Sequence, residues 1–331
     1  MASISFGLSI PVGLIQLERL LNLVELADNL NYDTFWVHEN PIYGDSFAII
    51  AILSQLNKKI KLGIGCTSVI TRHPIMIASS AITLQNLSRG RFILGLGLGG
   101  FPWLPLIGYP IHPVKETKPL KRIAEAVKII KALTNGERVH YEGKFYRING
   151  FALFTKPTKY IPIYIASLSE KTLSYAPSFA DGVITSPGVM TPKDIERMLN
   201  WVKKGEEKYN KKIIKACYVL VSVDENDREA IEAVKRDPYF LYQLADVVKE
   251  ESLVEYGVKI DKMKEIREAW MRRDLSFASK LVSDEMVLAL TATGSKENAL
   301  SRFESFFKIG YDTFIISPVG KIEEAIKTFS R

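Results

Sequence analysis

The residues that could carry chemistry in this chain of 331 residues stand just after short apolar runs. Glu39 is the only carboxylate among them and His38 the only imidazole, so the paired carboxylates of glycoside hydrolysis are missing. The full set is Ser9, His38, Glu39, Asn40, Cys66, Thr67, Gly97, Gly99, Ser167, Thr185, Ser186 and Ser317.

Sites for a metal or for a nucleophilic side chain are not indicated. None of the four histidines stands at metal-ligand spacing from another histidine or from a cysteine. The chain also has no Gly-x-Ser-x-Gly elbow, no Walker-type phosphate loop and no Cys-x-x-Cys pair. We therefore expect no catalytic metal, and chemistry that comes from a bound cofactor.

A glycine-rich segment at 95–100 matches the Gly-x-Gly-x-x-Gly pattern of dinucleotide-binding folds. That pattern requires a helix directly after the glycines, whereas Pro102, Pro105 and Pro110 follow here. We reject a Rossmann site. Gly97 and Gly99 then have two explanations of equal weight: close approach of a planar ring to the backbone, or tight packing of a strand against a loop.

Two loop segments could contact an anion. Residues 167–170 form a helix start, either as a capping box of Ser167 and Glu170 or with Ser169 as the N-cap. The free N–H groups there, with Lys171 beside them, could equally bind a phosphate. At 71–74, the Arg72 side chain reads as a solvated cation in a turn rather than as a ligand contact.

The elements that must position these residues alternate between β-branched runs and apolar residues at helical spacing, which predicts βα units around a parallel sheet. Helices are expected at 17–30, 75–87 and 119–133. Eight strands favour a closed (β/α)8 TIM barrel over a doubly wound open sheet. The strands are predicted at 5–10, 34–38, 61–66, 91–97, 162–166, 182–186, 214–223 and 312–317.

Two insertions interrupt the alternation within what we expect to be one domain, residues 1–331. Residues 137–155 have alternating aromatics around Glu142-Gly143 and predict a β-hairpin. Residues 225–290 are charged and rich in helix patterns, with breaks at Asp237-Pro238 and Tyr256-Gly257. Such insertions line the mouth of a barrel or form an oligomer contact, and we expect a homo-oligomer.

Composition and charge limit the classes of partner that the protein is expected to bind. The net charge is +7, but the lysines are spread among glutamates on amphipathic segments, which is not typical of nucleic-acid binding. No apolar run is long enough for a membrane span, and no signal peptide is recognisable. Two cysteines far apart indicate a reducing compartment. We expect a cytoplasmic protein with a small-molecule substrate.

Several short segments resemble a known family. Thr71-Arg72-His73-Pro74-Ile75, residues 78–84, 88–91 and 94–97, then 162–166, 180–182 and 316–320, are similar in order and spacing to the luciferase-like flavin and deazaflavin oxidoreductases. Within this family the likeness is greatest to the archaeal methylenetetrahydromethanopterin reductases. It extends over nearly the whole chain.

The resemblance implies an oxidoreductase with a (β/α)8 barrel and coenzyme F420, which carries hydride at C5 of a deazaflavin. Methylenetetrahydromethanopterin, or a related pterin, would be the first substrate to test. FMN is the alternative cofactor, because other members of the family are FMN-dependent monooxygenases. A third hypothesis is a non-catalytic flavin or deazaflavin binder.

Site residues also follow from the resemblance. A non-prolyl cis peptide is implied at Gly65-Cys66, against the middle of the deazaflavin. The remaining cofactor contacts would be Glu39, Thr67, Gly97, Gly99, Ser167, Leu168, Ser169, Lys171 and Thr172, with Thr185 as a wall residue. Glu39, Ser9 and Asn40 are the candidate catalytic residues.

The chain departs from the reductases at two of these positions. Ser9 stands where they have a glutamate, and Glu39-Asn40 where they have Asp-His. His38 precedes the carboxylate and should point to the other side of its strand, so it is not taken as a substitute for the missing imidazole.

Overall fold

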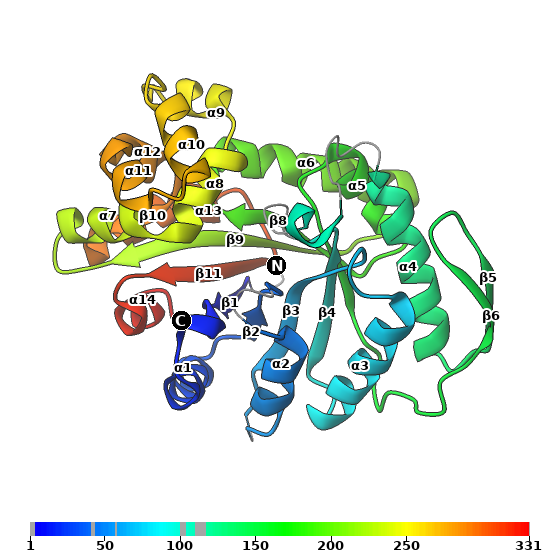
Figure 1. Cartoon of the computed structure of the whole chain (residues 1–331). Helices are drawn as coiled ribbons and strands as arrows, with labels where there is room; N and C mark the ends of the chain where they lie inside the picture. Colours follow the sequence, from blue (N-terminus) through cyan, green and yellow to red (C-terminus); the bar gives the residue numbers. More distant parts are fainter. Residues whose placement is uncertain (1–3, 41–43, 57, 100–103, 110–116, 331) are drawn as a thin grey trace.

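The computed structural model describes residues 4–40, 44–56, 58–99, 104–109 and 117–330, and its centre is a closed barrel of parallel strands (Figure 1). The eight strands follow one another around the barrel in chain order, and the last pairs with the first. They are β1 (Ser5–Ser9), β2 (Thr34–Val37), β3 (Lys61–Ser68), β4 (Phe92–Gly97), β7 (Ile163–Ala166), β8 (Gly182–Gly188), β9 (Ile214–Val223) and β11 (Thr313–Val319).

Closure is made by the ladder between β1 and β11. Ser5 lies opposite Thr313 and Leu8 opposite Ile316, and the Ser5 and Thr313 hydroxyls are 2.6 Å apart. An open sheet would leave these two strands as edges, so the doubly wound alternative is excluded. The (β/α)8 barrel is confirmed, with each strand within a few residues of its predicted place.

Helices cover the outside of the barrel. The apolar residues of α1 recur at helical spacing, so Leu20, Leu23, Val24 and Ala27 are all buried. A proline at the first position opens α3, α4 and α6, where its missing N–H costs no hydrogen bond. The outer helices are α1 (Leu17–Asn29), α2 (Ser46–Ser54), α3 (Pro74–Leu87), α4 (Pro119–Thr134), α5 (Glu170–Tyr175), α6 (Pro192–Tyr209), α13 (Lys296–Phe307) and α14 (Ile322–Thr328).

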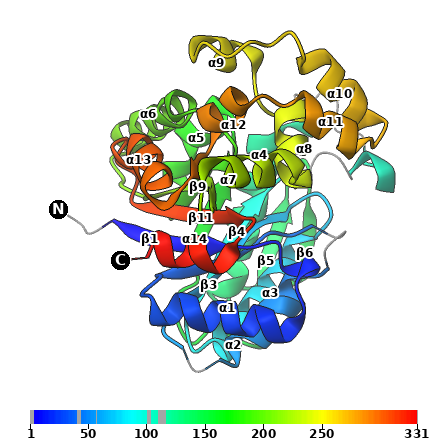
Figure 2. The same ribbon diagram turned by 90° about the vertical axis from the view of Figure 1, so that its left-hand side faces the viewer.

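The segment between β9 and α13 forms a separate group of helices to one side of the barrel (Figure 2). These helices bury their own apolar cluster, which includes Phe240, Leu244 and Ile266. They are α7 (Asp227–Arg236), α8 (Pro238–Asp246), α9 (Glu250–Glu255), α10 (Met263–Met271), α11 (Leu275–Leu281) and α12 (Asp284–Leu290), followed by the short strand β10 (Ala292–Gly294) beside β9. On the other side of the barrel, β5 (Val139–Glu142) and β6 (Arg147–Phe151) pair as an antiparallel hairpin (Figure 1).

The lower part of the barrel interior is filled with side chains. Trp36 is at its centre, and a Cβ atom at Gly63 would collide with the Trp36 ring, so that glycine makes room for the indole. The other inward residues are Ile93, Tyr164, Ile184, Ala216, Tyr218 and Ile315. A ligand can therefore enter only above this layer, at the carboxyl ends of the strands. No helix among the described residues has the length and apolar character to span a membrane.

Candidate active site at the barrel mouth

Three aromatic and titratable side chains meet at the top of the Trp36 layer, to which one of them, Tyr218, itself belongs. His38 follows β2 two residues after Trp36 and points, like it, into the barrel. Its ring lies 4.7 Å from the ring of Tyr218 on β9 and 6.3 Å from that of Tyr239 on α8. Burial lowers the pKa of His38 to about 4, although the Gly65 backbone acts in the opposite direction. The imidazole is therefore neutral at ordinary pH.

The predicted cis peptide between Gly65 and Cys66 is present in β3. The Tyr218 hydroxyl donates a 3.2 Å hydrogen bond to the Gly65 carbonyl oxygen from across the barrel. The ladder between β3 and β4 shifts register at this point, between Ile64 and Thr67. Burial raises the pKa of the Cys66 thiol to about 12, with the Glu39 carboxylate adding to the effect, so Cys66 is not a nucleophile here.

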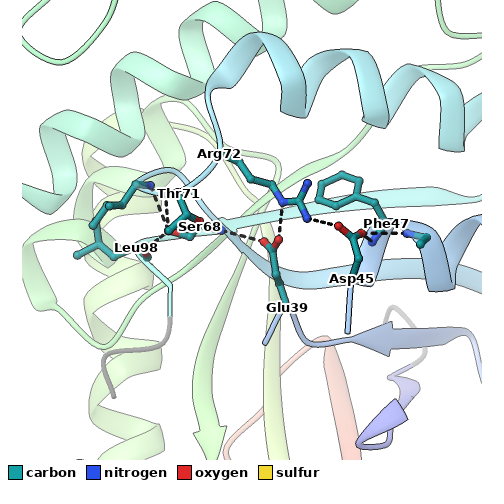
Figure 3. A network of polar contacts seen from close by, with 9 residues as sticks. Glu39, Asp45, Phe47, Ser68, Thr71, Arg72 and Leu98 are labelled. Atoms are coloured by element: carbon teal, nitrogen blue, oxygen red, sulfur yellow. Dashed lines mark hydrogen bonds and ion pairs between the residues drawn. The ribbon is translucent and has the colours of Figure 1, made fainter. Parts of the chain in front are cut away.

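Glu39, the predicted catalytic carboxylate, is held in a network of polar contacts (Figure 3). It accepts hydrogen bonds from the Arg72 guanidinium and from the Ser68 N–H, the latter at 3.2 Å. Arg72 also donates to Asp45 at 2.6 Å, and Asp45 caps α2 through the N–H groups of Phe47 and Ala48. The interpretation of Arg72 as a solvated cation is thus wrong, because it bridges two carboxylates. Glu39 has its lone pairs engaged and faces Arg72, whereas His38 faces the barrel interior.

Ser9 and Asn40, which were also predicted to be catalytic, interact with neighbouring groups as well. The buried Ser9 hydroxyl donates to the Trp36 carbonyl oxygen at 3.0 Å, which places it in the layer beneath the mouth. Asn40 is partly exposed and has an interaction with a neighbouring group. Thr67 differs from both, because its hydroxyl is fully buried and has no hydrogen-bond partner among the described residues.

Packing explains the glycines after β4. A Cβ atom at Gly97 would lie 2.5 Å from the Cys66 sulfur, and one at Gly99 would lie 2.7 Å from Ser68 Cβ. Gly99 also has a φ of +103°, which favours glycine. Of the two explanations, tight packing of strand against loop accounts for both residues.

The segment from Ser167 to Thr172 does not form the capping box, but Ser169 is the N-cap residue of α5, as the other alternative predicted, although its side chain makes no capping hydrogen bond. The Ser167 N–H donates to the Ile184 carbonyl oxygen, and the Ser167 hydroxyl accepts from the Ser169 N–H at 3.1 Å. Ser169 and Lys171 are exposed, whereas Thr172 is buried within α5. Leu168 borders a small cavity of about 60 Å³, which is also lined by Trp201, Arg197 and Lys249.

The prediction for Thr185 needs correction. Its hydroxyl lies 2.8 Å from the Tyr311 hydroxyl, which in turn donates to the Ile195 carbonyl oxygen of α6. Thr185 therefore points outward, between barrel and helices, and is not a wall residue of the mouth. Alternation along β8 puts its neighbour Ile184 on the inner face.

Sequence reasoning placed His38 among the residues that follow the strands but gave it no role, and it did not select Tyr218 or Tyr239. A signal for the first two was available: Trp36 and His38 share a strand face, and Tyr218 lies in the middle of an apolar run. Tyr239 comes from the insertion, where it donates a 2.7 Å hydrogen bond to the Pro187 carbonyl oxygen near the end of β8. No periodicity in the sequence links α8 to that strand.

These residues fit a ring-bearing cofactor with an anionic end. The orphan Thr67 hydroxyl is adjacent to the Gly65-Cys66 peptide and is available to a polar ring edge. His38, Tyr218 and Tyr239 supply flat surfaces and polar atoms at the same level. The cavity beside Leu168 has cationic side chains at Arg197 and Lys249, although Arg197 is paired with Asp194.

Several known proteins are similar to this chain in sequence. The chain is 30% identical to 5,10-methylenetetrahydromethanopterin reductase of Archaeoglobus fulgidus, over 90% of this chain and 89% of that protein. It is 27% identical to the reductase of the same name from Methanopyrus kandleri, over 98% and 95%. F420-dependent glucose-6-phosphate dehydrogenase of Mycolicibacterium smegmatis is 28% identical over 70% of this chain and 67% of that protein.

Solved structures match the fold. The coenzyme F420 dependent tetrahydromethanopterin reductase of Methanopyrus kandleri superposes with a TM-score of 0.87 at 24% identity, over 99% of this chain and 97% of that one. An F420-dependent secondary alcohol dehydrogenase gives 0.78 at 19%, again over 99% and 97%. The model of the luciferase-like monooxygenase family matches residues 3–313. The chain belongs to the luciferase-like monooxygenase family.

Proposed function

We propose that this protein is an oxidoreductase dependent on coenzyme F420, with methylenetetrahydromethanopterin or a related pterin as its substrate. The observation that carries the proposal is the extended similarity to two reductases of that substrate, each over 89% or more of both chains. The F420-dependent dehydrogenases support the same cofactor for a wider set of substrates.

The chain's own residues would bind the cofactor ring above the Trp36 layer. Bound there, coenzyme F420 would supply or accept a hydride at C5 of its deazaflavin. The Gly65-Cys66 peptide and Thr67 would contact the ring from β3, and Tyr239 of α8 would help to exclude water from the mouth. Ser169, Lys171 and the cavity beside Leu168 would hold the anionic end.

Localisation and assembly belong to the same proposal. The two cysteines are unpaired, which supports a reducing, cytoplasmic environment. The outer helices leave large apolar side chains such as Met76 and Ile52 exposed, which supports self-association. An archaeal source would supply both F420 and the pterin.

The test is to titrate the purified protein separately with F420 and FMN, following absorbance and fluorescence. Methylenetetrahydromethanopterin is then added to the protein with reduced F420 under nitrogen. Binding of F420 and its reoxidation by the pterin are expected. Binding without reoxidation would exclude this substrate, and binding of FMN alone would exclude the F420 assignment in favour of a monooxygenase.

A matched pair of variants tests the place of the cofactor. Thr67→Val removes the orphan hydroxyl at almost unchanged size and should weaken F420 binding about 5- to 10-fold, the effect of one lost hydrogen bond. Thr83→Val is the control, because Thr83 is on the exposed face of α3 and bonds only its own helix. Equal affinities in the two variants would place the ring away from Thr67.

A further inference from the structure

One basic side chain among the described residues lies on the inner face of the barrel mouth, enclosed by aromatic rings and only partly exposed. His38 is flanked by Tyr218, which belongs to the Trp36 layer, and by Tyr239. It forms no salt bridge with a described residue. The candidates selected from the sequence are otherwise engaged, since Glu39 is bound by Arg72 and Ser9 bonds to the Trp36 backbone.

From this arrangement we propose that His38 is the group that exchanges the proton with the substrate. The proposal rests on the function proposed above and assigns one residue to it. In the direction of substrate oxidation, a substrate carbon would lose a hydride while the neutral imidazole accepts the proton of a substrate N–H or O–H. The electron pair left on that nitrogen or oxygen would form the new bond to the oxidised carbon. The substrate thus loses one proton and one hydride, which carries two electrons; the hydride would pass to the bound deazaflavin, and the imidazolium would pass its proton to water.

Geometry favours His38 over its two aromatic neighbours. The Tyr218 hydroxyl is already a donor to Gly65, and the Tyr239 hydroxyl is a donor to Pro187. His38 also bonds to the Gly65 backbone, but its imidazole has a second nitrogen that can accept a proton. Burial also raises the pKa of both phenols well above the usual value of 10, so neither ionises near neutrality. Cys66, which also faces this group of side chains, is a half-buried thiol whose pKa is raised to about 12. An imidazole needs no ionisation to accept a proton.

The position of His38 also explains how the chain can depart from the reductases at two sites. A glutamate at Ser9 and a histidine at Asn40 are both missing, and His38 introduces an imidazole two residues before Asn40. Because side chains alternate along an extended chain, positions 38 and 40 lie on one side and Glu39 on the other, so His38 brings an imidazole to the side that the missing histidine would occupy.

The experiment compares the wild type with His38→Gln and with His140→Gln, a control on the exposed face of the hairpin. Affinity for F420 is measured by fluorescence, and kcat and KM are measured with the pterin. We expect F420 affinity and KM of His140→Gln within about 3-fold of the wild type, and a loss of F420 affinity for His38→Gln that is small beside its loss of kcat. For His38→Gln we expect kcat to fall about 100-fold, the usual effect of losing a general base. A kcat within 3-fold of the wild type would overturn the role of His38 and leave the proposed function intact.

A second measurement on the wild type does not depend on turnover or on folding of the variant. With histidines labelled by ¹⁵N, the imidazole of His38 is observed in the free protein, then with F420, then with the pterin added. We expect a neutral imidazole at pH 6 whose nitrogen resonances shift when the pterin binds. Unchanged resonances in the ternary complex would overturn the proposal. Failure of F420 to bind at all would overturn the proposed function and this assignment together.

Discussion

The Arg72 side chain joins the connection between β3 and α3 to the connection between β2 and α2 at the mouth of the barrel. It bridges Glu39, which follows β2, and Asp45, which caps α2, while its guanidinium lies 4.6 Å from the Phe47 ring centre. The two carboxylates also raise the pKa of the Arg72 guanidinium above its usual value. Glu39 is 9% exposed, so its charge needs a partner.

Replacing Arg72 therefore has a predictable cost. Arg72→Met should lower the free energy of unfolding by about 1–3 kcal/mol, because the nearly buried Glu39 carboxylate loses a charged donor. Arg19→Met is the control, since the Arg19–Glu323 pair is exposed and should contribute less than about 1 kcal/mol. Urea denaturation of both variants measures the difference. Equal losses would mean that the Glu39 network is solvated.

His38 should make stability depend on pH. Its pKa is about 4 in the folded protein and 6.5 when unperturbed, so between these values the unfolded chain binds a proton that the folded chain does not. The contribution of the neutral imidazole is complete above pH 6.5 and is lost as the pH falls toward 4. Tyr218, Tyr239 and the Gly65 backbone surround it, and none supplies a compensating negative charge at these pH values.

The measurement is the melting temperature of wild type, His38→Gln and His140→Gln between pH 7 and pH 5. The advantage of the wild type over His38→Gln should shrink as the pH falls, because only the wild type loses this contribution. The His140→Gln variant should follow the wild type throughout. A constant difference between wild type and His38→Gln would contradict the depressed pKa.

Residue types alone identified the mouth but not the orientation of its side chains. Alternation shows that His38 and Glu39 face opposite ways, yet it does not say which of them faces inward. The packing of Trp36 against Gly63 and Gly65 decides that, and it requires the register between β2 and β3. The same limit applies to Thr185, whose outward direction is fixed by Tyr311, more than a hundred residues away.

Single elements were more predictable, because their signals are local. Pro74 and Pro119 mark the first turns of α3 and α4, and Asp237 both ends α7 and caps α8 through the Phe240 N–H. The three-residue strand β10 was not predicted. Three residues are too few to show an alternation of apolar and polar side chains. The pairing of β10 with β9 also depends on the insertion that precedes β10.

The contact between α5 and α6 depends on a glycine within a helix. A Cβ atom at Gly205 would collide with the Ser174 carbonyl oxygen, so α6 lies as close to α5 as two backbones allow. Alanine has the higher helix propensity by about 1 kcal/mol. Gly205→Ala should nevertheless destabilise the protein by about 1–3 kcal/mol, because the helices must separate.

Lys204→Ala, at an exposed neighbouring position, is the control and should change stability by less than about 0.5 kcal/mol. A stabilised Gly205→Ala protein in thermal or urea unfolding would show that the two helices can separate freely.

Contacts with α14 stabilise the closed barrel. α14 buries Ile326 and Phe329 against the barrel, and the Tyr32 hydroxyl donates to the Ile326 carbonyl oxygen at 2.9 Å. Ending the chain at Lys321 should remove about 4–7 kcal/mol, from two buried side chains and one hydrogen bond. That is a large part of the stability of an ordinary domain, so the truncated protein should melt far lower or aggregate. Full-length Glu324→Gln, at an exposed position of α14, should melt like the wild type. Normal melting of the truncated chain would mean that β11 closes the barrel without help.

The pairing of β1 with β11 also limits when the barrel can close during synthesis of the chain. A ribosome makes β1 long before β11, since 308 residues separate Ser5 from Thr313, so the strand that completes the ring is the last of the eight to emerge. Until then β1 is an open edge, able to pair with any strand that reaches it. Slow or interrupted synthesis would lengthen that interval, and the yield of folded protein in a cell should depend on how quickly β11 follows the other seven strands.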